Sequence, residues 1–271
     1  MRLKLILPDI EEPTELTWKF SKPAYLLLSI YNTIRGQKYI KSVPKRFEIP
    51  PLGLLTVASL TPAGVDISII DERIKRVVYD EPVDLVGISV TTQVSARAYT
   101  IAEAFRKRGI TVVLGGVHPT LLPEEAAMHA DAVVVGEAEI VWPQLVEDFQ
   151  EGRLKKFYYG GHNFDLSYVP NLRRELIDNN QYITPNVVQV GRGCPHNCSF
   201  CSVTRVYGGK YRHRPVSEVV REIQSLSGKF ILFLDDNLLL IFRYPESRVS
   251  AGGQESCKMF QICCWTGRNF G

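Results

Sequence analysis

The chain has 271 residues, of which 45% are hydrophobic and 23% charged, so it can bury the core of one large or two small globular domains. A formal net charge of +3 is too small to indicate a nucleic-acid-binding protein. No apolar run approaches the roughly 18–20 residues that span a bilayer, and residues 1–10 do not resemble a secretory signal. These features predict a cytoplasmic protein without a transmembrane segment.

The first half of the chain alternates between apolar runs typical of strands and amphipathic runs typical of helices. Strands are predicted at 3–8, 65–71, 84–90, 111–116 and 132–136, and helices at 49–61, 95–108, 123–130 and 139–149. Residues 9–48 are expected to be a long connection with a short helix around 24–34. The rhythm predicts an α/β domain over residues 1–150, a doubly wound parallel sheet of the flavodoxin or Rossmann type.

In such sheets ligands bind beyond the carboxyl ends of the strands. Hydroxyl groups there supply hydrogen bonds, and glycines let a ligand approach the backbone, although a tight turn explains a double glycine equally well. The candidate ligand-binding residues at these ends are Ser89, Thr91, Thr92, Gly115, Gly116, His118 and Gly136.

A polar stretch rich in turn formers, residues 151–186, is expected to link this domain to a second unit, with one short helix near 170–178. The second unit is predicted to cover residues 187–237. It starts with a β-branched strand that leads into a loop with Cys194, Cys198 and Cys201 in a C-x3-C-x2-C spacing. The helix expected after this loop begins near Ser217, and residues 229–234 form the next strand.

Three closely spaced thiols indicate a metal centre in a reducing compartment. Zinc normally takes four protein ligands in a structural site, and His196 or His213 could supply the fourth. An iron–sulfur cluster is also held by cysteine thiolates. Three ordinary buried thiols are the remaining alternative, but the surrounding Gly, Pro, His, Asn and Ser residues argue against an apolar setting.

The cysteine spacing, with Phe200 directly before the last cysteine, resembles the signature of radical S-adenosylmethionine (SAM) enzymes. The resemblance implies a [4Fe-4S] cluster on the three cysteines, with SAM chelating the fourth iron and Phe200 near its adenine. It also implies reductive SAM cleavage to a 5′-deoxyadenosyl radical, and an external electron donor such as a flavodoxin or ferredoxin. The fold implied for residues 187–237 is the first part of a (β/α) partial barrel.

The resemblance extends in both directions from the cysteines. The run FLDDN resembles the second barrel strand of the subgroup with an N-terminal cobalamin-binding domain, and it suggests SAM-binding roles for Asp235, Asp236 and Asn237. A helix N-cap explains the two acids equally well. The segments ISVTT, LGGVHPT and VGEAE resemble that subgroup's cobalamin-binding domain, in which the strand ends line the nucleotide tail of the cofactor.

The cobalamin pattern departs from the family at one point. Many such domains carry a cobalt-ligating histidine after the first strand, and PDIEEPTELT contains none. Either cobalamin binds without that histidine, or the fold is retained and the cofactor lost. His118 is expected to be a loop hydrogen-bonding residue, and the short basic cluster formed by Lys210, Arg212, His213 and Arg214 a solvated rim.

Residues 238–271 show no βα rhythm, and we expect this atypical tail to be foreign to the family, as after a frame shift or truncation. The function that the resemblance implies is radical chemistry, methylation or rearrangement, on an unknown substrate, with cobalamin as a candidate third cofactor. Because the histidine is missing, we expect cobalamin to bind weakly or not at all compared with a domain that carries it. The alternatives are a truncated and inactive relative, and a non-enzymatic zinc-binding module.

Overall fold

The structure is a computed structural model and describes residues 1–9, 48–227, 230–238 and 240. The helix expected around residues 24–34 and most of the tail expected from residue 238 lie outside these residues.

The strands of the first unit are β1 (Arg2–Leu7), β2 (Asp66–Asp71), β3 (Leu85–Ser89), β4 (Thr111–Gly115), β5 (Ala132–Gly136) and β6 (Phe157–Gly161). Its helices are α2 (Leu52–Leu60), η1 (Thr92–Val94), α3 (Ser95–Arg106), α4 (Val117–Leu121), α5 (Pro123–His129) and α6 (Ala138–Gln150).

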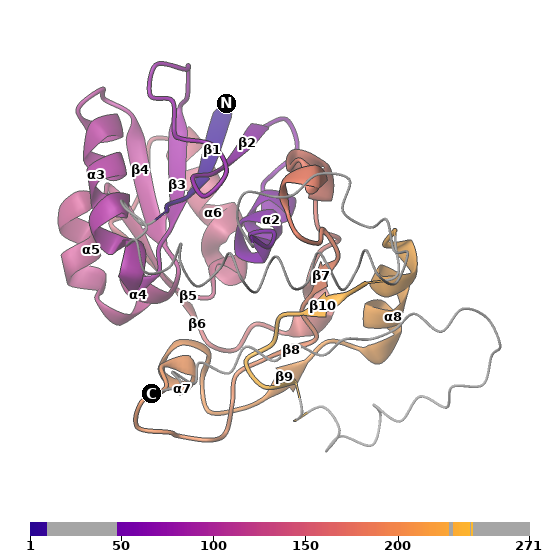
Figure 1. The fold of residues 1–271 in the computed structure, drawn as a ribbon. Helices are drawn as coiled ribbons and strands as arrows, with labels where there is room; N and C mark the ends of the chain where they lie inside the picture. Colours follow the sequence, from indigo (N-terminus) through magenta and orange to yellow (C-terminus); the bar gives the residue numbers. More distant parts are fainter. Residues whose placement is uncertain (10–47, 228–229, 239, 241–271) are drawn as a thin grey trace, which may run out of the picture.

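These strands form one parallel six-stranded sheet in the order β2-β1-β3-β4-β5-β6 (Figure 1). The order reverses between β1 and β3, as in flavodoxin-like sheets, so the predicted doubly wound fold is confirmed. The sheet has one strand more than the five predicted. Its sixth strand, β6, comes from residues that we had placed in the linker after residue 150.

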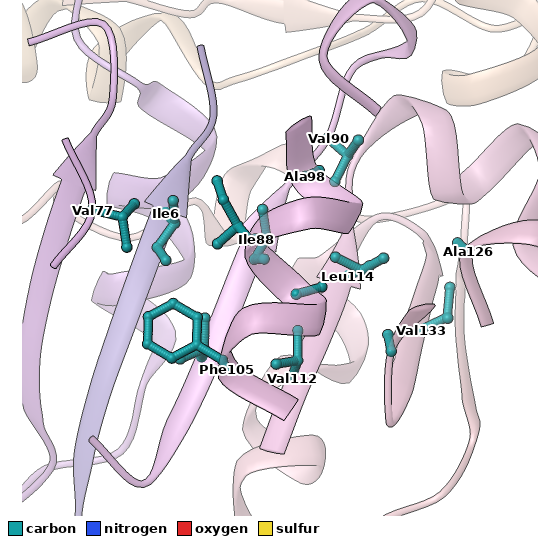
Figure 2. Close-up of a cluster of buried hydrophobic side chains, with 14 of the residues drawn as sticks. Ile6, Val77, Ile88, Val90, Ala98, Phe105, Val112, Leu114, Ala126 and Val133 are labelled. Carbon is teal, nitrogen blue, oxygen red and sulfur yellow. The ribbon is translucent and has the colours of Figure 1, made fainter. Parts of the chain in front are cut away.

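Helices cover both faces of the sheet and bury a separate apolar core on each. One face packs on α3 and α5, where Phe105 and Ile101 contact Ile6, Ile88 and neighbouring strand residues (Figure 2). The other face packs on α2 and α6 through residues such as Leu54 and Trp142. Strands covered on both faces are expected to be apolar throughout, which explains why β3 and β4 contain almost no polar residues.

The second unit is smaller. Its elements are β7 (Val187–Val188), β8 (Gly191–Arg192), α7 (Val203–Tyr207), β9 (Arg212–His213), α8 (Val216–Ser225) and β10 (Leu232–Phe233). The connection ahead of it contains η2 (Leu166–Tyr168), η3 (Arg174–Leu176) and η4 (Asn179–Gln181). β7 pairs in parallel with β10, and β8 pairs antiparallel with β9. The parallel pair with the intervening α8 is the βα arrangement expected for the start of a barrel.

The connection between the units contains short 3-10 turns. η3 stands where the sequence predicted a helix near residues 170–178. Arg174 in this turn donates hydrogen bonds to the carbonyl oxygens of Pro185 (2.9 Å) and Val187 (2.6 Å) and pairs with Glu222 of α8 (2.8 Å). These contacts hold the connection against the second unit. Among the described helices, none is long and apolar enough to cross a membrane.

Candidate functional site

The cysteine loop follows β8 and leads into α7. Cys194 is half-buried against the small apolar core of the second unit, Cys198 is exposed, and Cys201 is intermediate. All three are free thiols. The loop is held by short-range hydrogen bonds: the amide of Cys198 donates to the carbonyl of His196 (3.0 Å), and the amide of Cys201 donates to the carbonyl of Cys198 (3.1 Å). The predicted loop at a strand end is therefore observed.

Gly193 makes the turn from β8 into this loop. Its φ of +81° lies in the left-handed region. A Cβ at residue 193 would also come within 3.2 Å of the carbonyl oxygen of Tyr207 and 3.3 Å of that of Gly208, besides meeting that of Lys210. Only glycine satisfies both constraints, so this residue fixes how the first cysteine leaves the strand.

Two adjacent acids after β10 hold the strand that leads to the loop. The carboxylate of Asp235 accepts hydrogen bonds from the backbone amides of Val190 (3.1 Å) and Gly191, and that of Asp236 accepts from the amide of Gly193 (2.9 Å). Burial raises the pKa of Asp235 to about 7, although the two amide hydrogen bonds oppose the rise. Burial also raises the pKa of Asp236. Neither acid is the N-cap of a following helix in the described residues.

The remaining residues predicted to bind SAM differ in their surroundings. The side-chain amide of Asn237 lies 3.8 Å from Sγ of Cys194. The Phe200 side chain is 83% exposed, so it has no packing role in the described residues and is accessible to a ligand. The structure therefore places Asn237 at the first cysteine and Phe200 on the outer side of the loop.

The arrangement of the thiols bears on the choice of metal. Within the described part of the chain, no three His, Cys, Asp or Glu side chains are gathered so that they could hold one metal ion. In a zinc site all ligands lie about 2.0–2.3 Å from one ion and hence close to one another. In a cluster each cysteine binds a different iron, which spreads the sulfurs further apart. Among the described residues, the three thiols are therefore not gathered as the ligands of a single zinc ion would be.

The residues predicted to bind a ligand at the sheet do meet at one edge. Ser89, Gly115 and Gly136 are the last residues of β3, β4 and β5, and Thr91 and Thr92 are exposed just beyond β3. Gly116 has φ +103° and ψ −164°, and a Cβ there would lie 2.9 Å from the carbonyl oxygen of Val90. The second glycine is thus required by the turn itself.

His118 is buried, with an exposed fraction of 3%, and both of its ring nitrogens have partners. Nε2 lies 2.8 Å from the hydroxyl of Tyr99, which in turn donates to Glu125 (3.0 Å). Because the Tyr99 proton points to Glu125, Nε2 of His118 donates to the Tyr99 oxygen, and Nδ1 lies 3.4 Å from the hydroxyl of Thr92. His118 therefore belongs to a hydrogen-bond chain that ends at Thr92, in agreement with the predicted hydrogen-bonding role.

Sequence reasoning missed a buried charge cluster between the two units. Glu137, directly after β5, accepts hydrogen bonds from Arg192 (3.1 Å) and Arg212 (2.9 Å), and Glu139 pairs with Arg192 (2.6 Å). Arg214 is buried as well and pairs with Glu222. The prediction that Arg212 and Arg214 lie on a solvated rim was wrong, since both guanidinium groups are engaged by carboxylates.

Two family models match the sequence, the B12 binding domain over residues 45–146 and the radical SAM superfamily over residues 188–255. A bacteriochlorophyllide d C-8(2)-methyltransferase of Chlorobaculum tepidum is 42% identical over 171 residues, 59% of this chain and 37% of the relative. An uncharacterized methyltransferase of Pyrococcus horikoshii is 32% identical over 232 residues, 70% of this chain and 50% of the relative. The chain spans half or less of the length of these relatives.

Among solved structures, the fold is similar to that of TsrM from Kitasatospora setae, a radical S-adenosylmethionine methyltransferase solved with cobalamin and a [4Fe-4S] cluster bound. The TM-score is 0.59 at 15% sequence identity, and the match covers 89% of this chain and 49% of that one. The likeness covers both the sheet unit and the unit with the cysteine loop.

Proposed function

Because the chain belongs to the radical SAM superfamily, in the subgroup with a B12-binding domain ahead of the cysteine loop, we propose that it transfers a methyl group with the help of a [4Fe-4S] cluster, SAM and cobalamin. The observation that carries the proposal is the loop itself. Three free cysteines stand at the end of a strand whose backbone is fixed by two partly buried acids. Relatives over this region are named as methyltransferases.

Cys194, Cys198 and Cys201 would hold three irons of the cluster and leave the fourth for SAM. When bound, the cluster supplies the electron that cleaves SAM. The chain's own contribution is to orient the thiols: Gly193 sets the turn, Asp236 holds its amide, and Asn237 lies beside the sulfur of Cys194. The exposed ring of Phe200 is free to cover an adenine, and an external electron donor such as a flavodoxin or ferredoxin would supply the reducing equivalents.

We assign the cobalamin edge to the carboxyl ends of β3, β4 and β5. When bound, cobalamin supplies a cobalt centre that accepts and donates a methyl group. Thr91 and Thr92 offer exposed hydroxyls, and Gly115 offers exposed backbone between them and Gly136. His118 keeps the hydroxyl of Thr92 oriented through its Nδ1 and is not the cobalt ligand, because both of its ring nitrogens are engaged.

Rearrangement without methyl transfer is the second candidate. It is favoured by one relative, an anaerobic magnesium-protoporphyrin IX monomethyl ester cyclase of Synechocystis, which is 27% identical over 218 residues. The two reactions differ in products. Methyl transfer converts one SAM to S-adenosylhomocysteine, and any second SAM that the cluster cleaves gives 5′-deoxyadenosine and methionine. Radical rearrangement releases only 5′-deoxyadenosine and methionine.

The test uses the full chain, reconstituted anaerobically with iron, sulfide and hydroxocobalamin and supplied with SAM that carries a deuterated methyl group. After reduction with dithionite, we expect S-adenosylhomocysteine and a cobalamin that carries the deuterated methyl group, measured by mass spectrometry. Formation of 5′-deoxyadenosine alone would favour rearrangement. A chain that binds zinc and yields a colourless product with no SAM turnover would overturn the proposal in favour of the zinc module.

A further inference from the structure

Glu137 is a fully buried carboxylate at the ligand edge of the sheet. It follows Gly136, the last residue of β5, and its side chain has no exposed surface. A carboxylate withdrawn from water is strongly destabilising unless it is paired and hydrogen-bonded. The partners of Glu137 do not come from the sheet unit, so the stability of this acid depends on the second unit.

Three segments outside the sheet donate to this one carboxylate. Arg192 of β8 donates to Oε1 (3.1 Å), and Nη1 of Arg212 in β9 donates to both oxygens (3.0 and 2.9 Å). The amide of Phe164, in the connection between the units, donates to Oε2 (3.0 Å). Arg212 also donates to the carbonyl of Phe164 (2.8 Å), which closes the network around that peptide.

The register of the β8–β9 ribbon explains why an acid is needed here. Arg192 and Arg212 are directly opposite each other in the antiparallel pair. Like charges in that relation repel and destabilise a ribbon. Glu137 contacts both guanidinium groups and neutralises the pair, and Glu139 adds a second carboxylate on Arg192 (2.6 Å). Docking on the end of β5 therefore relieves the repulsion between the two arginines of the ribbon.

This ribbon leads directly to the cysteines, because Arg192 precedes Cys194 by two residues. We propose that Glu137 is a positioning residue, which holds the cysteine loop at a fixed place relative to the carboxyl edge of the sheet. A ligand bound at that edge would lie beside Gly136, the neighbour of Glu137, so the same residue would link occupancy of the edge to the loop. The role of the edge as the cobalamin site rests on the proposed function, whereas the docking does not.

The first test needs no cofactor. Phe164 has both its amide and its carbonyl engaged in the network, so chymotrypsin should cleave slowly after it, while Tyr168 in the same connection is 73% exposed and serves as the internal reference. Glu137→Gln keeps the side-chain shape but places an NH₂ group against two donors. We expect cleavage after Phe164, relative to Tyr168, to rise at least fivefold, roughly the effect of losing about 1 kcal/mol.

Glu147→Gln is the matched control, since Glu147 is an exposed acid on α6 and is hydrogen-bonded to Gln144 of the same helix. Its cleavage ratio should stay within twofold of wild type. Adding Arg212→Gln to Glu137→Gln removes the repulsion between the opposed arginines, so the double variant should recover part of the protection. An unchanged cleavage ratio in Glu137→Gln overturns the inference, whatever the cofactors do.

The second test separates positioning from stability. In the reconstituted chain, cob(II)alamin and the reduced cluster are both paramagnetic, so cobalamin speeds the spin relaxation of the cluster by an amount that depends on their separation. Glu137→Gln should bind iron and cobalamin at wild-type ratios but lose at least half of this enhancement, and Glu147→Gln should retain it. Loss of protease protection with full enhancement would make Glu137 only a stabilising residue. Failure of the wild-type chain to take up either cofactor would overturn the proposed function and leave the protease result to decide the docking.

Discussion

The side-chain amide of Asn237 lies 3.8 Å from the sulfur of Cys194. The segment that follows β10 therefore contacts the first cysteine of the loop that begins at the end of β8. Asp235 and Asp236, just before Asn237, hold the backbone of the same loop. Three consecutive residues after one strand therefore organise the thiol site. The backbone hydrogen bonds give both acids a structural role, although partial burial disfavours their ionisation.

The dependence of the cluster on each thiol is the first prediction. The next cysteine in the sequence after Cys201 is Cys257, so no cysteine close to the loop along the chain offers a replacement ligand. Cys198→Ala should abolish the iron–sulfur absorbance after anaerobic reconstitution, with Cys257→Ala as the control that keeps it. Full iron retention in Cys198→Ala would show that the loop does not hold a cluster.

The raised pKa of Asp235 predicts a defined pH dependence. Its pKa is about 7 in the folded chain against 3.8 for an ordinary Asp, so between these values the folded state binds more protons than the unfolded state. The contribution of Asp235 to the free energy of unfolding is therefore fully present below about pH 4. It is lost as the pH rises toward 7, by an amount on the order of 2–4 kcal/mol. Asp235→Asn should remove this component.

Urea unfolding of the cofactor-free chain, followed by circular dichroism at pH 4.5 and 7.5, measures the effect. The difference in unfolding free energy between wild type and Asp235→Asn should shift in favour of the variant at the higher pH. A difference that is the same at both pH values would mean that Asp235 ionises normally in its backbone contacts.

The two glycines after β4 should respond differently to alanine. Gly116 adopts φ +103° and ψ −164°, a region used almost only by glycine, and its Cβ would contact the Val90 backbone at 2.9–3.0 Å. Gly116→Ala should destabilise the chain by about 3 kcal/mol or more. Gly115→Ala is the matched control, because its Cβ would meet only Val134 at an ordinary 3.5 Å.

The binding of hydroxocobalamin is a second measurement that distinguishes Gly115→Ala from Gly116→Ala. If the ligand approaches the backbone at Gly115, Gly115→Ala should preserve stability and weaken hydroxocobalamin binding in equilibrium dialysis. Equal stability of the two variants would show that the turn does not need a glycine at residue 116.

The ion pair between Glu72 and Arg97 carries the fourth prediction. Burial alone would raise the pKa of Glu72, but two hydrogen bonds (2.9 and 2.7 Å) and the charge of Arg97 lower it below its usual value. The ion pair contributes to the free energy of unfolding above about pH 4.5, and this contribution is lost as the pH falls through the lowered pKa of Glu72. Arg97→Met would leave a buried acid and should destabilise the chain by about 3 kcal/mol at pH 7.

Arg97→Met should also reverse the pH dependence that Glu72 gives to the free energy of unfolding. Without Arg97, burial dominates, and ionising Glu72 becomes unfavourable, so stability should fall as pH rises from 4 to 7. Adding Glu72→Gln to Arg97→Met should restore part of the lost free energy of unfolding, measured with urea. If the effects of the two single substitutions simply add in the double variant, the two side chains do not interact directly.

The sheet could be predicted from the sequence because β3, β4 and β5 are short apolar runs between clear turn signals. β6 could not, because its residues alternate between buried and exposed and include two glycines, which weakens the apolar pattern. The cysteine loop was predicted from the β-branched run before it and from the spacing of its cysteines. Glu137 and Arg212 are 75 residues apart and meet only through the docking of two units, which no local pattern encodes.

The late position of β6 also determines where the chain can be divided. A fragment that ends at residue 150 would leave the hydrogen-bonding groups of β5 open along one edge, which invites strand addition by a second molecule. A fragment that ends after Gly161 would keep that edge paired, and the amide of Glu137 would still donate to the carbonyl of Gly161 (3.0 Å). The Glu137 side chain would then be hydrated instead of paired, and the sheet could be studied alone at neutral pH.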